Sequence, residues 1–338
     1  MPGSASEPGR GGPRAAALAL LAGPGRAART LRRTALALFT VFGAITAAFF
    51  ALRLVPVDPA FVIAGAGGEA VAITPEVLAA IRAEYHLGEP LPVQYLLYLQ
   101  RLLHGDLGMS YVQEQPVLSL IAGQVAPTLA LASLACAFAV LLSLGLAVFT
   151  AGHRGPSRVA SLLELVLGST PVFWVGFLLM LAFSVQWRVF PLLDDGSLRT
   201  LVLPALTIAL PTAAPLAQVL RRALQDTLEQ PFIMTARARG LSRLAVTWRH
   251  ALRHGLVPYL SLLGYAFGAL LGGAAITETL FGRPGLGRLL VQAVTHQDMP
   301  LVLGLVTVST VAFVGVNMLI DLAYLSVDHR LKAVMSAP

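Results

Sequence analysis

Six long apolar stretches alternate along the chain with shorter segments that hold most of its charged residues. A stretch of about 20 predominantly apolar residues is long enough to cross a bilayer as a helix. The pattern therefore predicts an all-α integral membrane protein with six transmembrane helices. The predicted helices lie near Thr34–Leu54, Thr128–Thr150, Ala160–Phe183, Leu201–Leu220, Leu256–Thr277 and Leu301–Leu325.

Positive charge collects in every second connecting segment, and the intervening segments are richer in acids. Cytoplasmic loops carry an excess of Lys and Arg, so we expect both termini in the cytoplasm. Residues 1–30 are expected to be a disordered basic tail, residues 31–55 the first transmembrane helix and residues 328–338 a short cytoplasmic tail. The cations are Arg26, Arg29, Arg32, Arg33, Arg154, Arg158, Arg221, Arg222, Arg330 and Lys332, and the acids of the opposite side are Asp58, Glu69, Glu76, Asp106, Asp194, Asp195 and Asp298.

Residues 56–123 form the one sizeable domain that is predicted outside the membrane, on the side opposite the termini. Thr74–Glu76 has the order of a helix start, with an N-cap threonine, a first-turn proline and an early acid. Gly88–Pro90 is expected to end this helix, and Val93–Leu103 predicts a second one. We therefore expect a small extracytoplasmic helical domain, docked on the main transmembrane domain of residues 124–327.

The composition agrees with a membrane location. The chain is 56% hydrophobic and only 12% charged, whereas a soluble domain has about 25% charged residues. The net charge of +7 is explained by cations at the cytoplasmic ends of the helices. No basic stretch is interleaved with aromatic residues, so binding of nucleic acid is not predicted. The single cysteine, Cys136, cannot form an internal disulfide.

Motifs that indicate an enzyme are missing from the sequence. It has no G-x-x-x-x-G-K-[ST] loop for ATP phosphates, no H-E-x-x-H zinc motif and no G-x-S-x-G nucleophile motif. His250 and His254 are one helical turn apart but lack an acidic or cysteine partner, so we interpret them as interfacial cations. Glu164 lies near a membrane interface, where a packing role is expected. We therefore expect no catalytic, metal or cofactor site in this chain.

Glycine and proline in the apolar stretches predict how the helices pack. Gly264, Gly268 and Gly272 recur every four residues and leave one helix face nearly free of side chains, which favours close approach of another helix. Pro171 is expected to bend the third helix. The fourth helix is expected to bend at Pro204, Pro211 and Pro215.

The segment Arg221–Gly255 crowds arginines between two apolar stretches. Gly240 is expected to end a first short helix, and Ser242 to cap a second, in which Leu244, Trp248 and Ala251 line one side. Gly255 and Pro258 are expected to separate this second helix from the next transmembrane helix. Two short helices with a glycine corner suit docking into a groove of another protein. A hairpin that lies on anionic lipid is the alternative.

The residues Thr235–Gly240, TARARG, resemble the Glu-Ala-Ala…Gly loop motif of ABC importer permeases, with Met234, Thr235 and Ala236 at the first three positions and Gly240 at the last. The wider resemblance is to the dipeptide, oligopeptide and nickel permease family, in its first-subunit form. Val57 departs from the glycine that this family often has. The stretches that carry the resemblance are LRLVPVDPA (Leu52–Ala60), HGDLGMS (His104–Ser110), RHALRHGLVP (Arg249–Pro258), ETLFGRPGLGRLL (Glu278–Leu290) and NMLIDLAYLSVDHRLK (Asn317–Lys332).

This resemblance implies a type I ABC importer permease in the bacterial inner membrane. The implied partners are a second homologous permease, two ATPase subunits that bind ATP and Mg²⁺, an extracytoplasmic solute-binding protein and membrane lipid. The chain itself would be non-catalytic and would line half of the translocation path. The ATPase-coupling residues implied by the motif are Thr235, Ala236, Arg237, Ala238, Arg239, Gly240 and Leu241.

Three questions stay open at this stage. The implied cargo is peptide, with nickel or a metal–opine chelate as the alternative within the class. An ion-coupled secondary transporter is the alternative from another class. Glu278, Pro284, Gly285 and Gly287 predict either a turn with a short interfacial helix at the outer mouth or a plain hairpin between two transmembrane helices.

Overall fold

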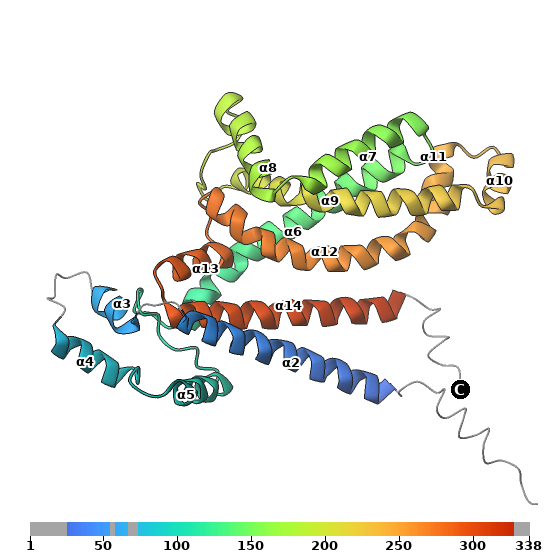
Figure 1. The fold of residues 1–338 in the computed structure, drawn as a ribbon. Helices are drawn as coiled ribbons and strands as arrows, with labels where there is room; N and C mark the ends of the chain where they lie inside the picture. The colour runs from blue at the N-terminus through green and yellow to red at the C-terminus, as the bar shows by residue number, and fades with distance from the viewer. Residues whose placement is uncertain (1–25, 55–57, 67–73, 328–338) are drawn as a thin grey trace, which may run out of the picture.

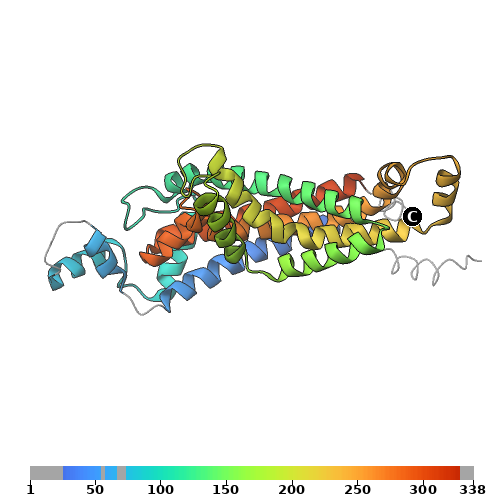
Figure 2. The same cartoon turned by 90° about the horizontal axis from the view of Figure 1, so that it is seen from above.

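The computed structural model describes residues 26–54, 58–66 and 74–327, and its regular elements are helices apart from one isolated β-bridge between Met109 and Pro116 (Figures 1 and 2). Most of the predicted tails and Val57 lie outside these ranges. The elements in chain order are α2 (Arg26–Arg53), α3 (Pro59–Ala66), α4 (Pro75–Glu84), α5 (Leu91–Leu103), α6 (Val117–Thr150), α7 (Arg154–Ser169), α8 (Val172–Leu179), the π-helix η1 (Met180–Gln186), α9 (Arg199–Leu228), α10 (Pro231–Ala238), α11 (Arg243–Val246), the π-helix η2 (Thr247–Ala251), α12 (Leu252–Leu280), α13 (Leu286–Thr295) and α14 (Met299–Val327).

Among the residues that the structure describes, four helices are long and apolar enough to cross a membrane. They lie within Thr34–Arg53, Val117–Thr150, Arg199–Leu228 and Met299–Met318. The bent pair of α7 with α8 and η1 gives a fifth if it counts as one crossing. The chain is therefore a mostly helical, multi-pass membrane protein. The count of six stays a prediction, and α12 contains the stretch that would supply the remaining crossing.

The third predicted transmembrane helix, Ala160–Phe183, is bent at Pro171 as expected, and so sharply that it forms two helices. The axes of its two parts differ by 106° at a break between Ser169 and Val172. Pro171 causes the break because the residue before a proline is pushed out of the helical region, and Thr170 has an extended backbone with φ −85° and ψ 128°. By contrast, α9 continues as one helix through Pro204, Pro211 and Pro215.

The two ends of the molecule carry different elements (Figure 1). Helices α3, α4, α5 and α13 lie at one end. At the opposite end lie α10, α11, the beginning of α2 and the end of α14. The arginines of the segment between α9 and α12 are therefore at the same end as the first and last described helical residues.

Helix α9 is the centre of the bundle. It packs against α6, α7, α8 and α12, while α2 packs against α14. Leu216, Leu220 and Leu224 of α9 are fully buried in one apolar cluster with residues of α6 and α12. Polar side chains at these positions of α9 would be destabilising, because they would lose hydrogen bonds to water and find no hydrogen-bond partner in the apolar cluster.

An ion pair lies between α7 and α9. The guanidinium of Arg221 donates to both carboxylate oxygens of Glu164, at 2.5 and 2.6 Å, and to the hydroxyl of Ser161 at 2.9 Å. Both charged side chains are almost completely buried. Each buried charged group takes the hydrogen bonds that water would otherwise give it from the other group. The pair therefore fixes the position of α7 along α9.

Close helix contacts occur at two other glycines of α12, Gly255 and Gly273. A methyl group added at Gly255 would lie 3.0 Å from Leu220, and one added at Gly273 would lie 3.5 Å from Ile208, so α12 approaches α9 at both. Gly264, Gly268 and Gly272 all lie in α12. The surroundings of Gly268 and Gly272 lie outside what the structure describes, so their packing role stays a prediction.

The helices of the segment after α2 follow the sequence signals closely. The hydroxyl of Thr74 accepts a hydrogen bond from the backbone N–H of Val77 at 3.4 Å, and α4 begins at Pro75. Helix α5 covers the predicted stretch. The next helix, α6, begins at Val117, well before the predicted Thr128, and runs through Pro127.

The ion pair between Arg221 and Glu164 leads to a prediction about stability. Glu164→Gln leaves a buried guanidinium without its counter-charge, and we expect it to destabilise the protein by about 3–5 kcal/mol. The double variant Glu164→Leu/Arg221→Met should recover most of this loss. Thermal unfolding of the purified protein in detergent measures both. Asp226→Asn, at an exposed position of α9, is the matched control, and an equal loss in this control would contradict the prediction.

Candidate functional site

The segment between α9 and α12 is the first candidate site, and we call residues 231–251 the elbow. Pro231 begins α10 at a position where its missing N–H costs no hydrogen bond. Gly240 follows the end of α10 and forms the corner, with a φ of +80°, a backbone conformation that other residues rarely adopt. Ser242 then caps α11, because its hydroxyl accepts from the N–H of Ala245 at 3.3 Å. The glycine corner and the serine cap are thus confirmed.

Buried apolar side chains hold the elbow against the bundle. Ile233 and Ala236 of α10 and Val246 of α11 lie in the same cluster as Leu224 and Leu228 of α9. This attachment makes the elbow part of the folded bundle.

A polar contact extends this attachment to the turn between α6 and α7. The guanidinium of Arg243 donates to the carbonyl of Gly152. Gly152 has φ +74°, and its carbonyl is available because the chain reverses there. The elbow is therefore linked to α6 and α7 as well as to α9.

The outward side of the elbow combines cations with large apolar side chains. Thr235, Arg237, Ala238, Arg239 and Gly240 are exposed. Exposed apolar side chains flank them, which is typical of a surface that another molecule covers. These are Phe232, Met234, Leu244 and Trp248.

Two details of the predicted elbow are wrong. Leu244 and Trp248 are exposed while Ala251 is buried, so the three do not line one packed side. The helix after Val246 is a π-helix, whose wider turn changes the face that each residue presents. In addition, Gly255 and Pro258 do not separate the elbow from the next helix, because α12 runs through both positions. The elbow therefore continues directly into α12.

The far end of α12 carries a buried carboxylate. One oxygen of Glu278 accepts from the hydroxyl of Thr128 at 2.6 Å, and the other accepts from the N–H groups of Gly287 and Arg288 at 2.8 and 3.1 Å. The hydroxyl of Thr128 in turn accepts from the N–H of Leu286 at 2.8 Å. An acid at the N-terminus of a helix satisfies unpaired donors and the helix dipole, so Glu278 joins α6, α12 and α13.

This network distinguishes between the two alternatives for residues 278–287. A short helix, α13, follows the turn, so the connection is more than a plain hairpin. A side chain at Gly285 would overlap the carboxylate of Glu278, and one at Gly287 would overlap the backbone of Ala275. Pro284 is exposed. Both glycines thus permit the close packing that the carboxylate requires.

Sequence reasoning missed two further polar links at this end. Arg283 donates to Asp194 at 2.8 Å and to the hydroxyl of Thr200 at 2.9 Å. Asp298, which is fully buried, accepts from the hydroxyl of Ser110 and from the N–H of Tyr111 at 3.1 Å. Both links join segments far apart in sequence, and no local pattern marks either pair.

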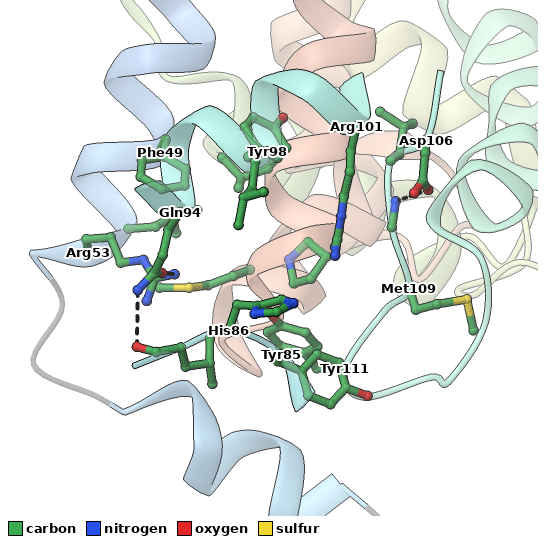
Figure 3. A pocket seen from close by; sticks show the side chains of 18 of the residues that line it. Phe49, Arg53, Tyr85, His86, Gln94, Tyr98, Arg101, Asp106, Met109 and Tyr111 are labelled. Carbon is green, nitrogen blue, oxygen red and sulfur yellow. Dashed lines mark hydrogen bonds between the residues drawn. The ribbon is translucent and has the colours of Figure 1, made fainter. Parts of the chain in front are cut away.

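A cavity of about 670 Å³ lies near these links and was also missed (Figure 3). The end of α2, the turn between α4 and α5, one face of α5, the loop after α5 and the beginning of α14 surround it. The elements that surround it lie at the end of the molecule opposite the elbow (Figure 1).

Two family profiles match this sequence. The profile of the binding-protein-dependent transport system inner membrane component family matches residues 139–333, and that of its N-terminal family matches residues 28–132. A probable peptide ABC transporter permease of Sinorhizobium fredii is 34% identical over 84% of this chain and 92% of its own length.

Two other relatives are similar at the same level. A putative peptide transport system permease of Brucella abortus is 36% identical over 89% of this chain and 98% of its own. The glutathione transport system permease GsiC of Salmonella choleraesuis is 35% identical over 84% of this chain and 92% of its own. The solved structure of an amino acid ABC transporter matches with a TM-score of 0.48 and 22% identity, covering 62% of this chain and 95% of that one.

The Glu278 network leads to a second prediction. In Glu278→Gln the amide nitrogen cannot accept a hydrogen bond, so buried N–H or hydroxyl donors lose their partner at a cost of about 1–3 kcal/mol. We expect faster hydrogen exchange at the start of α13, measured by mass spectrometry of peptides that cover residues 282–292. Thr279→Ala, at an exposed neighbouring position, should leave this exchange unchanged. Wild-type exchange in Glu278→Gln would show that the carboxylate does not hold α13.

Proposed function

This chain belongs to the family of binding-protein-dependent transport system inner membrane components, and we propose that it is the peptide permease subunit of an ATP-driven importer. It would line half of the translocation path, and a second, homologous permease would line the other half. The relatives named above carry peptide or glutathione names, which favours peptide over the nickel or metal-chelate alternative. The chain itself performs no ATP hydrolysis in this proposal.

The observation that carries the proposal is the continuity of the elbow with α12. A partner ATPase would receive Thr235–Leu241 in a cleft, where Arg237 and Arg239 face outward beside exposed apolar side chains. Because η2 leads into α12 without a break, movement of the elbow reaches α12 directly. The cluster with α9 and the Arg243 contact with Gly152 spread the same movement over α6, α7 and α9.

The other partners follow from the same proposal. Two ATPase subunits would bind ATP and Mg²⁺ and would each receive one elbow, one from each permease. An extracytoplasmic solute-binding protein would deliver the peptide at the end where α3, α4, α5 and α13 lie (Figure 1). The turn with Glu278, Pro284, Gly285 and Gly287 would then lie at the outer mouth, with α13 at the membrane interface.

The proposed location is the bacterial inner membrane, with both termini in the cytoplasm. The elbow arginines at the end where α2 begins and α14 ends support this orientation. Six crossings result if α7, α8 and η1 count as one and α12 as another.

The bonding of the buried acids argues against an ion-coupled secondary transporter. Such a carrier needs an ionisable group that exchanges its ion near the middle of the membrane. Glu164 is held by Arg221, and Glu278 by a hydroxyl and two backbone donors. Neither carboxylate is open to solvent in the structure.

A substitution at Gly240 tests the coupling role. Gly240→Val requires a left-handed backbone at a cost of about 1–2 kcal/mol, although the added side chain would meet open space. We expect this variant to lose peptide uptake and to retain the ATPase subunits poorly during purification. Uptake of a labelled dipeptide by cells that express the whole transporter, together with affinity copurification, measures both effects.

Two matched variants accompany this test. Gly240→Asn should keep most of the activity, because asparagine tolerates a left-handed backbone. Gly196→Val imposes the same backbone strain, since Gly196 has φ +79° and open space around it. Because Gly196 lies outside the elbow, we expect this variant to import peptide at the wild-type rate. Wild-type uptake with normal ATPase retention in Gly240→Val would refute the coupling role.

A further inference from the structure

The cavity at the end opposite the elbow has the dimensions of a small-molecule site. Its volume of about 670 Å³ lies within the roughly 300–1,000 Å³ of most ligand pockets. Its walls come from α2, α4, α5, α14 and the loop between α5 and α6. A cavity built from so many segments depends on the tertiary fold.

The walls of the cavity are held by hydrogen bonds that are independent of any ligand. Asp298 fixes the loop through Ser110 and the backbone of Tyr111. On the other side, Gln94 donates to the carbonyl of Glu89 at 2.7 Å, and the hydroxyl of Tyr98 bonds to Thr307 at 3.2 Å. The cavity is therefore preformed, which lowers the entropic cost of binding.

Two guanidinium groups from different helices face the cavity. Arg53 of α2 donates to the side chain of Gln94, a neutral acceptor. Arg101 of α5 extends toward His86 and the two tyrosines 85 and 111 (Figure 3), and no acceptor in the described part of the chain bonds its side chain. A guanidinium with unused donors binds a carboxylate best, because the two planar groups match.

Both cations lie within electrostatic reach of the same phenol. Burial raises the pKa of Tyr111 to about 12, and the charges of Arg53 and Arg101 oppose this rise. The hydroxyl of Tyr111 thus stays protonated near neutral pH and can donate a hydrogen bond. A ligand carboxylate would find unused guanidinium donors at Arg101 and positive charge from both arginines.

The rest of the lining suits the other parts of a short peptide. Asp106 lies on the side of the cavity away from Arg53 (Figure 3), and Glu84 also lines the cavity, so negative charge is present for an ammonium group. Tyr85 and Tyr111 form an edge-to-face pair with ring centroids 5.5 Å apart, a surface for an apolar side chain.

The backbone of the lining is strained at one point. His86 has φ +52°, although it is not a glycine. Strained residues persist where the surrounding structure holds them, and they concentrate at binding sites. The turn between α4 and α5 therefore holds His86 toward the cavity at an energetic cost.

We propose that this cavity is a second binding site, which takes short zwitterionic peptides by their terminal carboxylate through Arg101. It is separate from the path that the bundle helices would line, and it would hold a peptide on the outer side before transport. This inference rests on the proposed function, because a peptide importer brings such molecules to this end of the chain.

Direct binding to the assembled transporter tests the proposal. The complex of both permeases and the ATPases, without the solute-binding protein, is placed in phosphatidylcholine nanodiscs and titrated calorimetrically with leucyl-phenylalanine and with its C-terminal amide. The wild type should bind the free acid more tightly. Arg101→Gln should weaken binding of the acid by about ten-fold or more and should leave binding of the amide unchanged.

Two control variants accompany this titration. Arg101→Lys should retain part of the preference for the acid, because it keeps the charge without the planar fork. Arg199→Gln removes an exposed arginine that does not line the cavity and should bind like the wild type.

Three results would overturn the proposal: no binding to the wild type, equal binding of the acid to the wild type and Arg101→Gln, or loss of binding when phosphatidylglycerol replaces phosphatidylcholine. The last would assign the cavity to the headgroup of an anionic lipid. ATP-driven uptake with the solute-binding protein present is measured in parallel. Normal uptake without direct binding overturns only this site, whereas a wild type that imports no peptide overturns the proposed function.

Discussion

A polar group inside a bilayer cannot bond to water, so it must find its partner within the protein. This constraint explains how the helices of the bundle are positioned. Glu164 and Arg221 neutralise each other between α7 and α9, and Glu278 satisfies donors of α6 and α13. Even single hydroxyls follow the rule, since Thr207 donates back to the carbonyl of Leu203 in its own helix. Each such bond restricts where one helix can lie along another.

The same constraint separates the bundle from its two ends. The elbow exposes charged side chains, whereas the bundle helices expose large apolar ones such as Phe39, Leu141 and Phe313. Because α12 runs from the elbow to Glu278 without a break, the two ends are connected through one continuous helix. A cue received at one end therefore has a mechanical route to the other through the apolar interior.

Features that depend on neighbouring residues were predictable from the sequence, and those that depend on packing were not. The caps at Thr74 and Ser242 and the corner at Gly240 each involve residues three or four positions apart, and all three are present. The family was also recognisable from its motifs. In contrast, Glu164 meets Arg221 across 57 positions and Thr128 meets Glu278 across 150, and nothing in the sequence announces either pair. The continuity of α12 through Gly255 was mispredicted because that glycine serves contact with Leu220.

The π-helix η2 has a consequence for how this chain and its relatives can diverge. A π-helix holds one more residue per turn than the α-helix around it, and a helical residue corresponds to about 100° of rotation. Deleting one residue within Thr247–Ala251 would convert the turn to α-helix, and because the extra residue is contained within that turn, the elbow and α12 would keep nearly the same relative orientation. The packing of α12 below Leu252 would stay the same. The same deletion in an α-helical part of α12 would instead turn the elbow by about 100°. The chain can therefore lose one residue at η2 without re-aiming the exposed side of the elbow.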